Sequence, residues 1–305
     1  MKKNISWRDF FRSLVQAVRR QNPFDYGTSG KVIHRETSDY HHILVTEDGQ
    51  SRYLRFDSSW QSGMFLTDPN RTNFVYNDYF FLSLVINPEI RTVLFIGLGG
   101  GSSPKKFHHD FPEMDIEVVE IDPAVLAIAQ KYFYFTTDER LRVYIEDGRT
   151  FLEQQEKTYD LIVHDAYYSE AVPLHLMTRE FFELVHRRLS PRGVVAFNLI
   201  GELSGYGSEM TRAVYKSWID IFAQVFVFDI KDKRNKIFIG TRFPVSLSKD
   251  ALVRRAGEMK KTRIKVPLLD AYAQRLYTRK IPTHDIPELT DALLEKDGAE
   301  LHRLL

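Results

Sequence analysis

Short apolar runs alternate with segments of helical spacing from residue 92 to residue 241. This alternation is typical of a Rossmann-like, doubly wound α/β sheet whose strands are mostly parallel. Strands are predicted at 92–96, 116–121, 141–145, 159–164, 193–199, 224–229 and 235–241, with the last two as an antiparallel hairpin. Helices are predicted between them, near 103–110, 123–131, 149–155, 178–188 and 208–222.

The preceding residues show a β pattern instead. Extended runs cover 31–36, 40–46 and 52–56, and Asp48-Gly49 provides a turn that tolerates positive φ. This predicts a small N-terminal antiparallel β domain. The apolar stretch 73–86 predicts a buried helix, and 248–260 and 285–303 are also expected to be helical. We therefore divide the chain into an N-terminal arm at 1–29, a β domain at 30–72, a Rossmann-like catalytic domain at 73–243 and a C-terminal helical extension at 244–305.

The N-terminal arm is basic and amphipathic, because apolar residues at helical spacing alternate with lysines and arginines over residues 1–22. Two interpretations stay open. The apolar stripe packs on the chain's own domain or on a second subunit, or the basic face contacts a membrane surface or an acidic partner.

Composition excludes several function classes. The 305 residues include no cysteine, which removes disulfides, thiolate nucleophiles and cysteine zinc sites. The formal net charge of +1 gives no general attraction to nucleic acid. No apolar run approaches the roughly 18 residues that a membrane span needs. We expect a cytoplasmic protein with no transmembrane segment and no nucleic-acid partner.

A glycine-rich turn follows the first predicted strand of the sheet and contains Gly97, Gly99, Gly100 and Gly101. Glycines let the backbone adopt positive φ and approach a ligand closely. The next strand ends in Glu120-Ile121-Asp122, and an acidic residue at this position suits the hydroxyl groups of a ribose. The pattern indicates a nucleoside-containing ligand.

Acidic residues recur at later strand ends. Asp147, followed by Gly148, is placed to accept from the amine of a base, and Asp165 lies at the mouth of the next strand. One such acid is as often a helix N-cap as a ligand contact. Recurrence at successive strands favours a binding site.

Together, these segments resemble the spermidine synthase family, the polyamine aminopropyltransferases, and the methyltransferases of similar build. The segments are Ser38-Asp39-Tyr40-His41, Tyr76-Asn77-Asp78, Gly97–Gly101, Glu120-Ile121-Asp122, Asp147-Gly148-Arg149, Asp165 and Leu176–Phe181. The resemblance implies a small β domain before a Rossmann-like domain of the S-adenosylmethionine-dependent methyltransferase type. It also implies a donor of the S-adenosylmethionine type, an amine or polyamine substrate, and a homodimer.

Three positions depart from the aminopropyltransferase pattern. Gly100 stands where that family has the aspartate that holds the amine of decarboxylated S-adenosylmethionine. Tyr168 replaces the second aspartate of the acceptor loop, and His41 replaces a glutamine. Two like charges about 4 Å apart cost roughly 4 kcal/mol at an effective dielectric near 20. We therefore expect Gly100 to leave room for the carboxylate of intact S-adenosylmethionine and to offer backbone N–H groups to it. This favours methyl transfer.

The resemblance and the residue chemistry assign these roles. Asp165 is the candidate base or cation anchor, with Tyr76 and Tyr168 beside it as catalytic residues. Donor binding is expected from Gly97, Gly99, Gly100, Gly101, Glu120, Ile121, Asp147, Gly148, Asp165 and His41. Substrate binding is expected from Tyr76, Asp78, Tyr167, Tyr168 and Glu170.

Two other functions are compatible with the same residues. The alternatives to N-methyl transfer are aminopropyl transfer from decarboxylated S-adenosylmethionine and a non-catalytic nucleoside-binding protein. A metal triad of His164, Asp165 and His175 can be drawn. Nothing in the sequence fixes its geometry, and no metal is expected.

Overall fold

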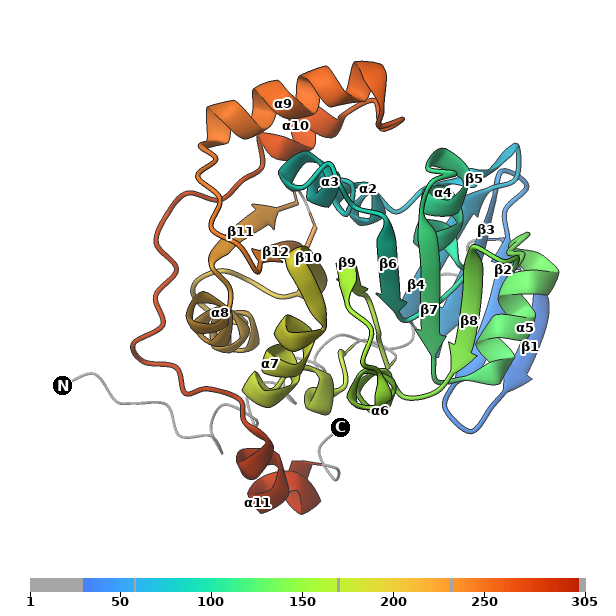
Figure 1. Cartoon of the computed structure of the whole chain (residues 1–305). Helices are drawn as coiled ribbons and strands as arrows, with labels where there is room; N and C mark the ends of the chain where they lie inside the picture. Colours follow the sequence, from blue (N-terminus) through green and yellow to red (C-terminus); the bar gives the residue numbers. More distant parts are fainter. Residues whose placement is uncertain (1–29, 58, 169–170, 231–232, 302–305) are drawn as a thin grey trace.

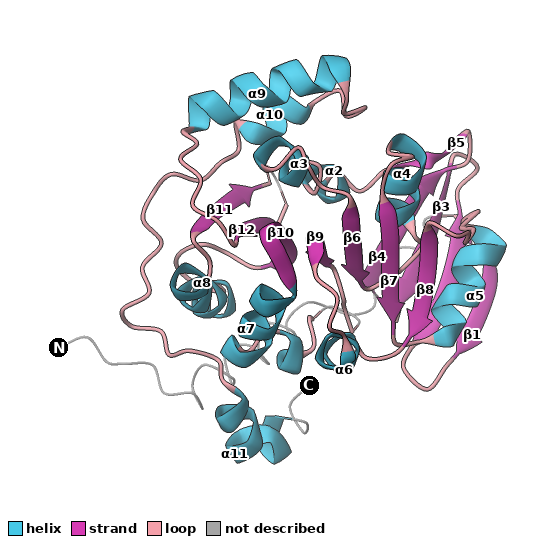
Figure 2. Cartoon of the chain, viewed as in Figure 1, coloured by secondary structure: helices cyan, strands magenta, loops and turns pink. Residues whose placement is uncertain are grey.

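Two β-sheets form the framework of the protein (Figures 1 and 2). The structure, a computed structural model, describes residues 30–57, 59–168, 171–230 and 233–301, so the predicted N-terminal arm lies outside the described residues. The larger sheet has seven strands in the order β11-β12-β10-β9-β6-β7-β8. Its strands are β6 (Thr92–Ile96), β7 (Asp115–Glu120), β8 (Leu141–Ile145), β9 (Tyr159–His164), β10 (Leu189–Ile200), β11 (Gln224–Asp229) and β12 (Asn235–Thr241).

The Rossmann-like prediction is confirmed. Strands β6 to β10 pair in parallel, and β12 runs antiparallel between β10 and β11, which confirms the terminal hairpin. Successive residues of a strand point to opposite faces. Val93 and Phe95 accordingly join one hydrophobic core cluster, and Leu94 and Ile96 join the other. The intervening helices are α4 (Ser102–Asp110), α5 (Pro123–Tyr132), α6 (Gly148–Gln154), the short 3₁₀ helix η1 (Leu174–Leu176), α7 (Arg179–Arg188) and α8 (Glu209–Ile221).

The N-terminal sheet contains five antiparallel strands in sequential order. Gly49 has φ +86° between the second and third strands, so the predicted Asp48-Gly49 turn is confirmed. Neither of the last two strands was among the predicted extended runs, and the final one consists of polar residues and includes Pro69. It is an edge strand, where proline is tolerated. The strands are β1 (Lys31–Thr37), β2 (His42–Glu47), β3 (Ser51–Phe56), β4 (Ser59–Phe65) and β5 (Asp68–Thr72).

Two predicted helices differ from the structure. The stretch 73–86 forms α2 (Tyr76–Tyr79) and α3 (Leu82–Ile86), because the N–H groups of Phe80 and Phe81 bond to carbonyls three residues back and tighten the turn. In the C-terminal region, α9 (Lys249–Thr262) and α10 (Leu269–Ala273) precede α11 (Asp291–Leu301). Residues 285–290 are not helical, since Pro287 disfavours helix at the residue before it.

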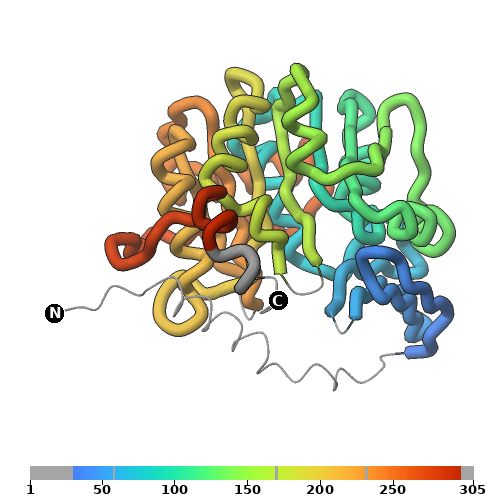
Figure 3. Tube along the Cα trace, turned by 90° about the horizontal axis from the view of Figure 1, so that it is seen from below, coloured from blue at the N-terminus to red at the C-terminus, as the bar shows by residue number. Residues whose placement is uncertain are grey.

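The strand order reverses at β6, whose neighbours are β7 and β9. Ligands of open α/β sheets bind beyond the carboxyl ends of the strands at such a point. Figure 3 views the chain from below, with the N-terminal sheet in blue at one side. Among the described residues, no helix combines the length and the apolar character needed to cross a membrane.

Candidate functional site

The glycine-rich turn between β6 and α4 is shaped by backbone conformation and by close packing. Gly97, Gly99 and Gly101 have φ of +97°, +53° and +73°, a region that other residues rarely adopt. A Cβ atom on Gly97 would lie 2.6 Å from the carbonyl oxygen of Asp165. The turn therefore passes directly against the end of β9, where Asp165 stands.

Gly100 differs from the sequence-based expectation. Its N–H donates to Ser62 Oγ at 2.8 Å, so this group is not offered to an anion. A Cβ atom at this position would lie 2.9 Å from Ser62 Cβ and 3.0 Å from the ring of Phe133. Glycine is required here because β4 packs onto the turn, and the predicted electrostatic reason is replaced by a steric one. An aspartate at position 100 has no room unless Ser62 moves.

The end of β7 holds two buried carboxylates and a histidine. Glu120 accepts from the N–H groups of Leu98 and Asp122 at 2.9 and 3.0 Å, and burial raises its pKa. Asp122 accepts from Ser38 Oγ and lies 3.0 Å from His41 Nδ1. It also caps α5 through the Ala124 N–H, so its side chain has a structural role.

The imidazole of His41 is fixed by its neighbours through one ring nitrogen. Its ring stacks on Phe56 at 4.0 Å, and Asp122 fixes Nδ1. Its Nε2 is buried and has no hydrogen-bond partner among the described residues. A buried polar atom without a partner is costly, so a hydrogen-bonding ligand at this point is favourable. Ile121, next to Glu120, is 36% exposed.

Asp147 is the N-cap of α6, as the capping interpretation allowed. One carboxylate oxygen accepts from the N–H groups of Arg149 and Thr150, and the other lies 2.8 Å from His175 Nε2. Burial acts to raise the pKa of Asp147, but His175 and the Thr150 N–H lower it to about 2. The next residue is glycine because a Cβ atom on Gly148 would lie 2.5 Å from Ile96 Cγ2.

Asp165 stands beyond the end of β9, beside an amide and a phenol. Asn198 Nδ2 donates to its Oδ1 at 2.8 Å, and the Tyr76 hydroxyl also hydrogen-bonds to it. Burial raises the pKa of Asp165 to about 7, and these two hydrogen bonds only partly oppose the rise. Burial and the same carboxylate raise the pKa of Tyr76 well above its usual value. The site thus offers a carboxylate that changes charge near neutral pH.

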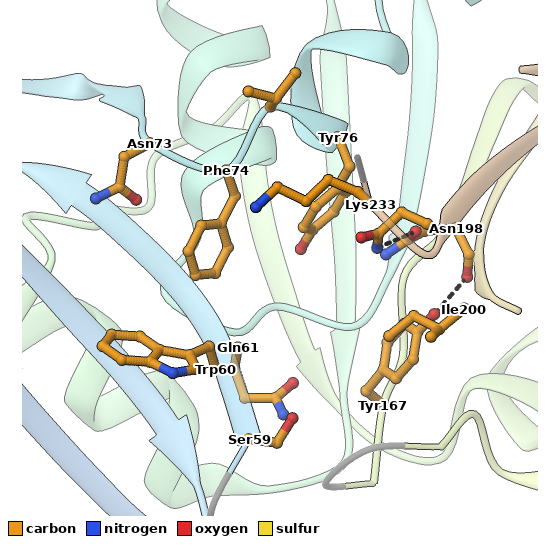
Figure 4. Close-up of a pocket in the computed structure, with 12 residues that line it drawn as sticks. Ser59, Trp60, Gln61, Asn73, Phe74, Tyr76, Tyr167, Asn198, Ile200 and Lys233 are labelled. Carbon is orange, nitrogen blue, oxygen red and sulfur yellow. Dashed lines mark hydrogen bonds between the residues drawn. The ribbon is translucent and has the colours of Figure 1, made fainter. Parts of the chain in front are cut away.

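A cavity of about 310 Å³ opens beside this group (Figure 4). Its walls come from β4, from the segment before α2, and from the ends of β10 and β12. Tyr167 donates its hydroxyl to the Asn198 carbonyl at 2.9 Å and forms one side. The lining residues are Ser59, Trp60, Gln61, Asn73, Phe74, Val75, Tyr76, Tyr167, Asn198, Ile200, Lys233 and Asn235.

Of the predicted substrate residues, Tyr76 and Tyr167 line this cavity and Asp78 does not. Asp78 hydrogen-bonds to Tyr272 and faces Lys106, so α2 turns it toward the C-terminal helices, and burial raises its pKa. Tyr168 is 57% exposed, with its ring 5.3 Å from that of His41. Glu170 lies outside the described residues.

The histidines drawn as a metal triad have other partners. His164 Nε2 lies 3.0 Å from the Leu176 carbonyl oxygen, and burial lowers its pKa to about 4, which keeps it neutral. His175 binds Asp147 instead of Asp165. No cluster of metal-ligating side chains is present in the part of the chain that the structure describes.

Comparisons with known proteins agree with this geometry. A polyamine aminopropyltransferase of Vibrio vulnificus is 32% identical over 93% of this chain and 91% of its own length. An eEF1A lysine and N-terminal methyltransferase of Xenopus laevis is 31% identical over 51% of this chain, which spans only 24% of that protein. The structure of human methyltransferase-like protein 13 in complex with SAH superposes with a TM-score of 0.57 at 26% identity. It covers 63% of this chain and 93% of its own.

The relatives are named as aminopropyl- or methyltransferases, and the fold is common to both groups. The spermine/spermidine synthase domain matches residues 76–228, from the cavity wall at Tyr76 through both strand-end carboxylates to β11. This chain belongs to the spermine/spermidine synthase domain family.

Proposed function

We propose that this chain is an S-adenosylmethionine-dependent transferase that methylates the nitrogen of an amine or polyamine by direct displacement. The observation that carries the proposal is the contact between Gly100 and Ser62. Both donors carry an ammonium group, but only intact S-adenosylmethionine also carries a carboxylate, which an aspartate at position 100, where the resemblance places one, would repel. Here Ser62 and Phe133 fill that space, so the turn carries no carboxylate to oppose that of the intact donor.

The residues at the end of β7 fit the donor's nucleoside. His41 Nε2 is a buried atom without a partner among the described residues, and with Nδ1 facing Asp122 it is the ring nitrogen left to hydrogen-bond to a hydroxyl group of the donor. Glu120 has accepting capacity beyond its two backbone bonds. Glu120, His41 and the partly exposed Ile121 would hold the ribose and base.

We assign to Asp165 the role of the base that accepts a proton from the acceptor amine. When bound, S-adenosylmethionine supplies a methyl group on a sulfonium: the N–C bond forms as the C–S bond breaks, and S-adenosylhomocysteine leaves. The attacking ammonium must first lose a proton, and Asp165, with a pKa of about 7, is matched to accept it near neutral pH. Its backbone lies against Gly97 and its side chain contacts Tyr76, so one residue joins the donor turn to the cavity wall.

Aminopropyl transfer is the second candidate. The match to the Vibrio vulnificus protein over almost the whole chain favours it. It requires a carboxylate elsewhere to hold the donor's ammonium.

Calorimetric titration with S-adenosylmethionine and with its decarboxylated form separates the candidates. Preference for the intact donor, together with methylated amine detected by mass spectrometry, is the expected result. Preference for the decarboxylated donor and an aminopropylated product would overturn the proposal. Donor binding without any turnover would point to the non-catalytic alternative.

A further inference from the structure

We infer that the acceptor amine carries an anionic group, such as a carboxylate, at the end remote from the reacting nitrogen, and that Lys233 binds this group. The inference rests on the proposed methyl transfer and narrows its acceptor. It places aminocarboxylates, and not polyamines, in the cavity.

The charge of the cavity lining is the first support. Its lining residues, as the structure describes them, are aromatic, aliphatic, hydroxyl or amide side chains with one exception, Lys233. Figure 4 shows this side chain reaching across the cavity toward Phe74. A polyamine brings a second ammonium group, which needs an anion. The lining supplies a cation instead, and like charges repel.

The turn that carries Lys233 is built around a buried lysine. Lys236 is 2% exposed, and its Nζ donates to the carbonyl oxygens of Lys233 and Arg234 at 3.3 and 3.4 Å. The same Nζ pairs with Asp229 at 3.1 Å. In addition, the Lys233 N–H donates to the Ile230 carbonyl. These bonds hold the main chain of Lys233, so the point from which its side chain projects is set by the β11–β12 hairpin.

Trp60 gives no competing cation site. The guanidinium carbon of Arg55 lies 5.2 Å from the centroid of its ring, and Arg55 is buried. A substrate ammonium stacked on the same indole would place two cations on one ring. The positive charge of Arg55 would then repel that of the substrate.

Two amides of the cavity lining lead to Asp165. Asn198 donates to Asp165 at 2.8 Å, and Asn235 Nδ2 donates to Asn198 Oδ1 at 2.9 Å. Asn235 is two residues from Lys233. The hydrogen-bonded row therefore links Asp165 to the segment that carries Lys233, and a cationic amine beside Asp165 with an anion beside Lys233 matches the charges of these two groups.

The experiment compares three amine series of equal chain lengths: ω-aminocarboxylates, diamines and unsubstituted alkylamines. Products are identified by mass spectrometry with each of the two donors, and binding of each series is measured calorimetrically in the presence of S-adenosylhomocysteine. We expect kcat/KM, and affinity, to fall in the order aminocarboxylate, alkylamine, diamine. Lys233→Gln should lower kcat/KM for the aminocarboxylates about fivefold, as for a partly solvated ion pair, and leave the alkylamines unchanged. Lys233→Glu should reverse the order.

A matched control removes the same charge elsewhere: Lys131→Gln on α5 lies outside the cavity lining and should change none of the series. Methylated diamines preferred over aminocarboxylates, or a Lys233→Gln effect equal in all series, would overturn the inference and leave methyl transfer intact. An aminopropylated product would instead overturn the proposed function. Equal affinity for all three series, with or without turnover, also overturns the inference.

Discussion

Replacing Asp165 by asparagine should make the protein more stable and inactive. Burial raises the pKa of this carboxyl group from 3.8 to about 7 in the folded chain. A raised pKa means that the folded state favours the protonated form. Its contribution to stability is present in full below about pH 3.8 and is lost as the pH rises through about 7. Asparagine has the same shape and no charge to desolvate, so it avoids that loss.

The magnitude follows from the shift. Roughly 3 pKa units at 1.36 kcal/mol each set a ceiling of about 4 kcal/mol. The side chain is only half-buried, so solvent screens part of the cost and about 2 kcal/mol is expected. The free energy of unfolding of Asp165→Asn, from urea titrations, should exceed that of the wild type at about pH 8. The two proteins should converge near pH 4.

Asp160 provides the matched control, because it stands at the opposite end of β9. Burial acts to raise its pKa, but hydrogen bonds from Ser190 Oγ and the Thr92 N–H lower it. A carboxylate with a lowered pKa stabilises the fold at pH values above the pKa of the unfolded state. This stabilisation is lost as the pH falls through the pKa of the folded state. Asp160→Asn should therefore destabilise the protein at about pH 8, and less at acid pH.

The reasoning is refuted if Asp165→Asn is no more stable than the wild type at about pH 8, or if the gain is equal at both pH values. Ionisation at this site would then cost nothing, and the argument for a base of near-neutral pKa would lose its foundation. The activity measurement is independent. The variant should bind S-adenosylmethionine with unchanged affinity and form no methylated product, and retained turnover would remove Asp165 from the mechanism.

Three further predictions test the donor side and the pH profile. Gly100→Ala should cost about 1–3 kcal/mol of unfolding free energy, because its Cβ meets Ser62 and Phe133, and Ser62→Gly in the same chain should recover part of this loss in a double-mutant cycle. His41→Ala should weaken S-adenosylmethionine binding about tenfold by calorimetry, and Asp122→Asn should weaken it less, since it only reorients the ring. The kcat/KM of the wild type should rise with pH through about 7 as Asp165 ionises, and a profile that is flat between about pH 6 and 8 would contradict this.

The sheet could be predicted because its signals are local. The apolar runs mark the strands closely: β6, β8, β9 and the two hairpin strands begin and end at the predicted residues. The strand-end carboxylates Glu120 and Asp165 were likewise visible, since the topology brings strand ends to one edge.

The acceptor cavity could not be predicted in the same way. Trp60 comes from β4 of the small sheet, and Lys233 from the turn between β11 and β12, so no sequence spacing relates them. The same limit explains Asp147, whose partner His175 lies in the separate 3₁₀ helix η1. Asp78 shows that closeness in sequence is also misleading. It lies two residues after Tyr76, yet the helix directs its side chain away from the cavity. The homodimer and the role of the arm at 1–29 stay predictions.

Strand β4 connects the two halves of the site. Ser62 packs onto the glycine turn at Gly100, while Ser59, Trp60 and Gln61 line the cavity. A change in the first half of this strand can therefore alter the acceptor without disturbing the residues at the end of β7 that would hold the nucleoside. A change at Ser62 acts on the donor turn. In this chain the serine excludes an acid from position 100, and the neighbouring residues build an uncharged wall opposite Lys233. The first feature removes an acid that would repel the carboxylate of intact S-adenosylmethionine, the second disfavours an acceptor with a second ammonium group, and one short strand contributes to both.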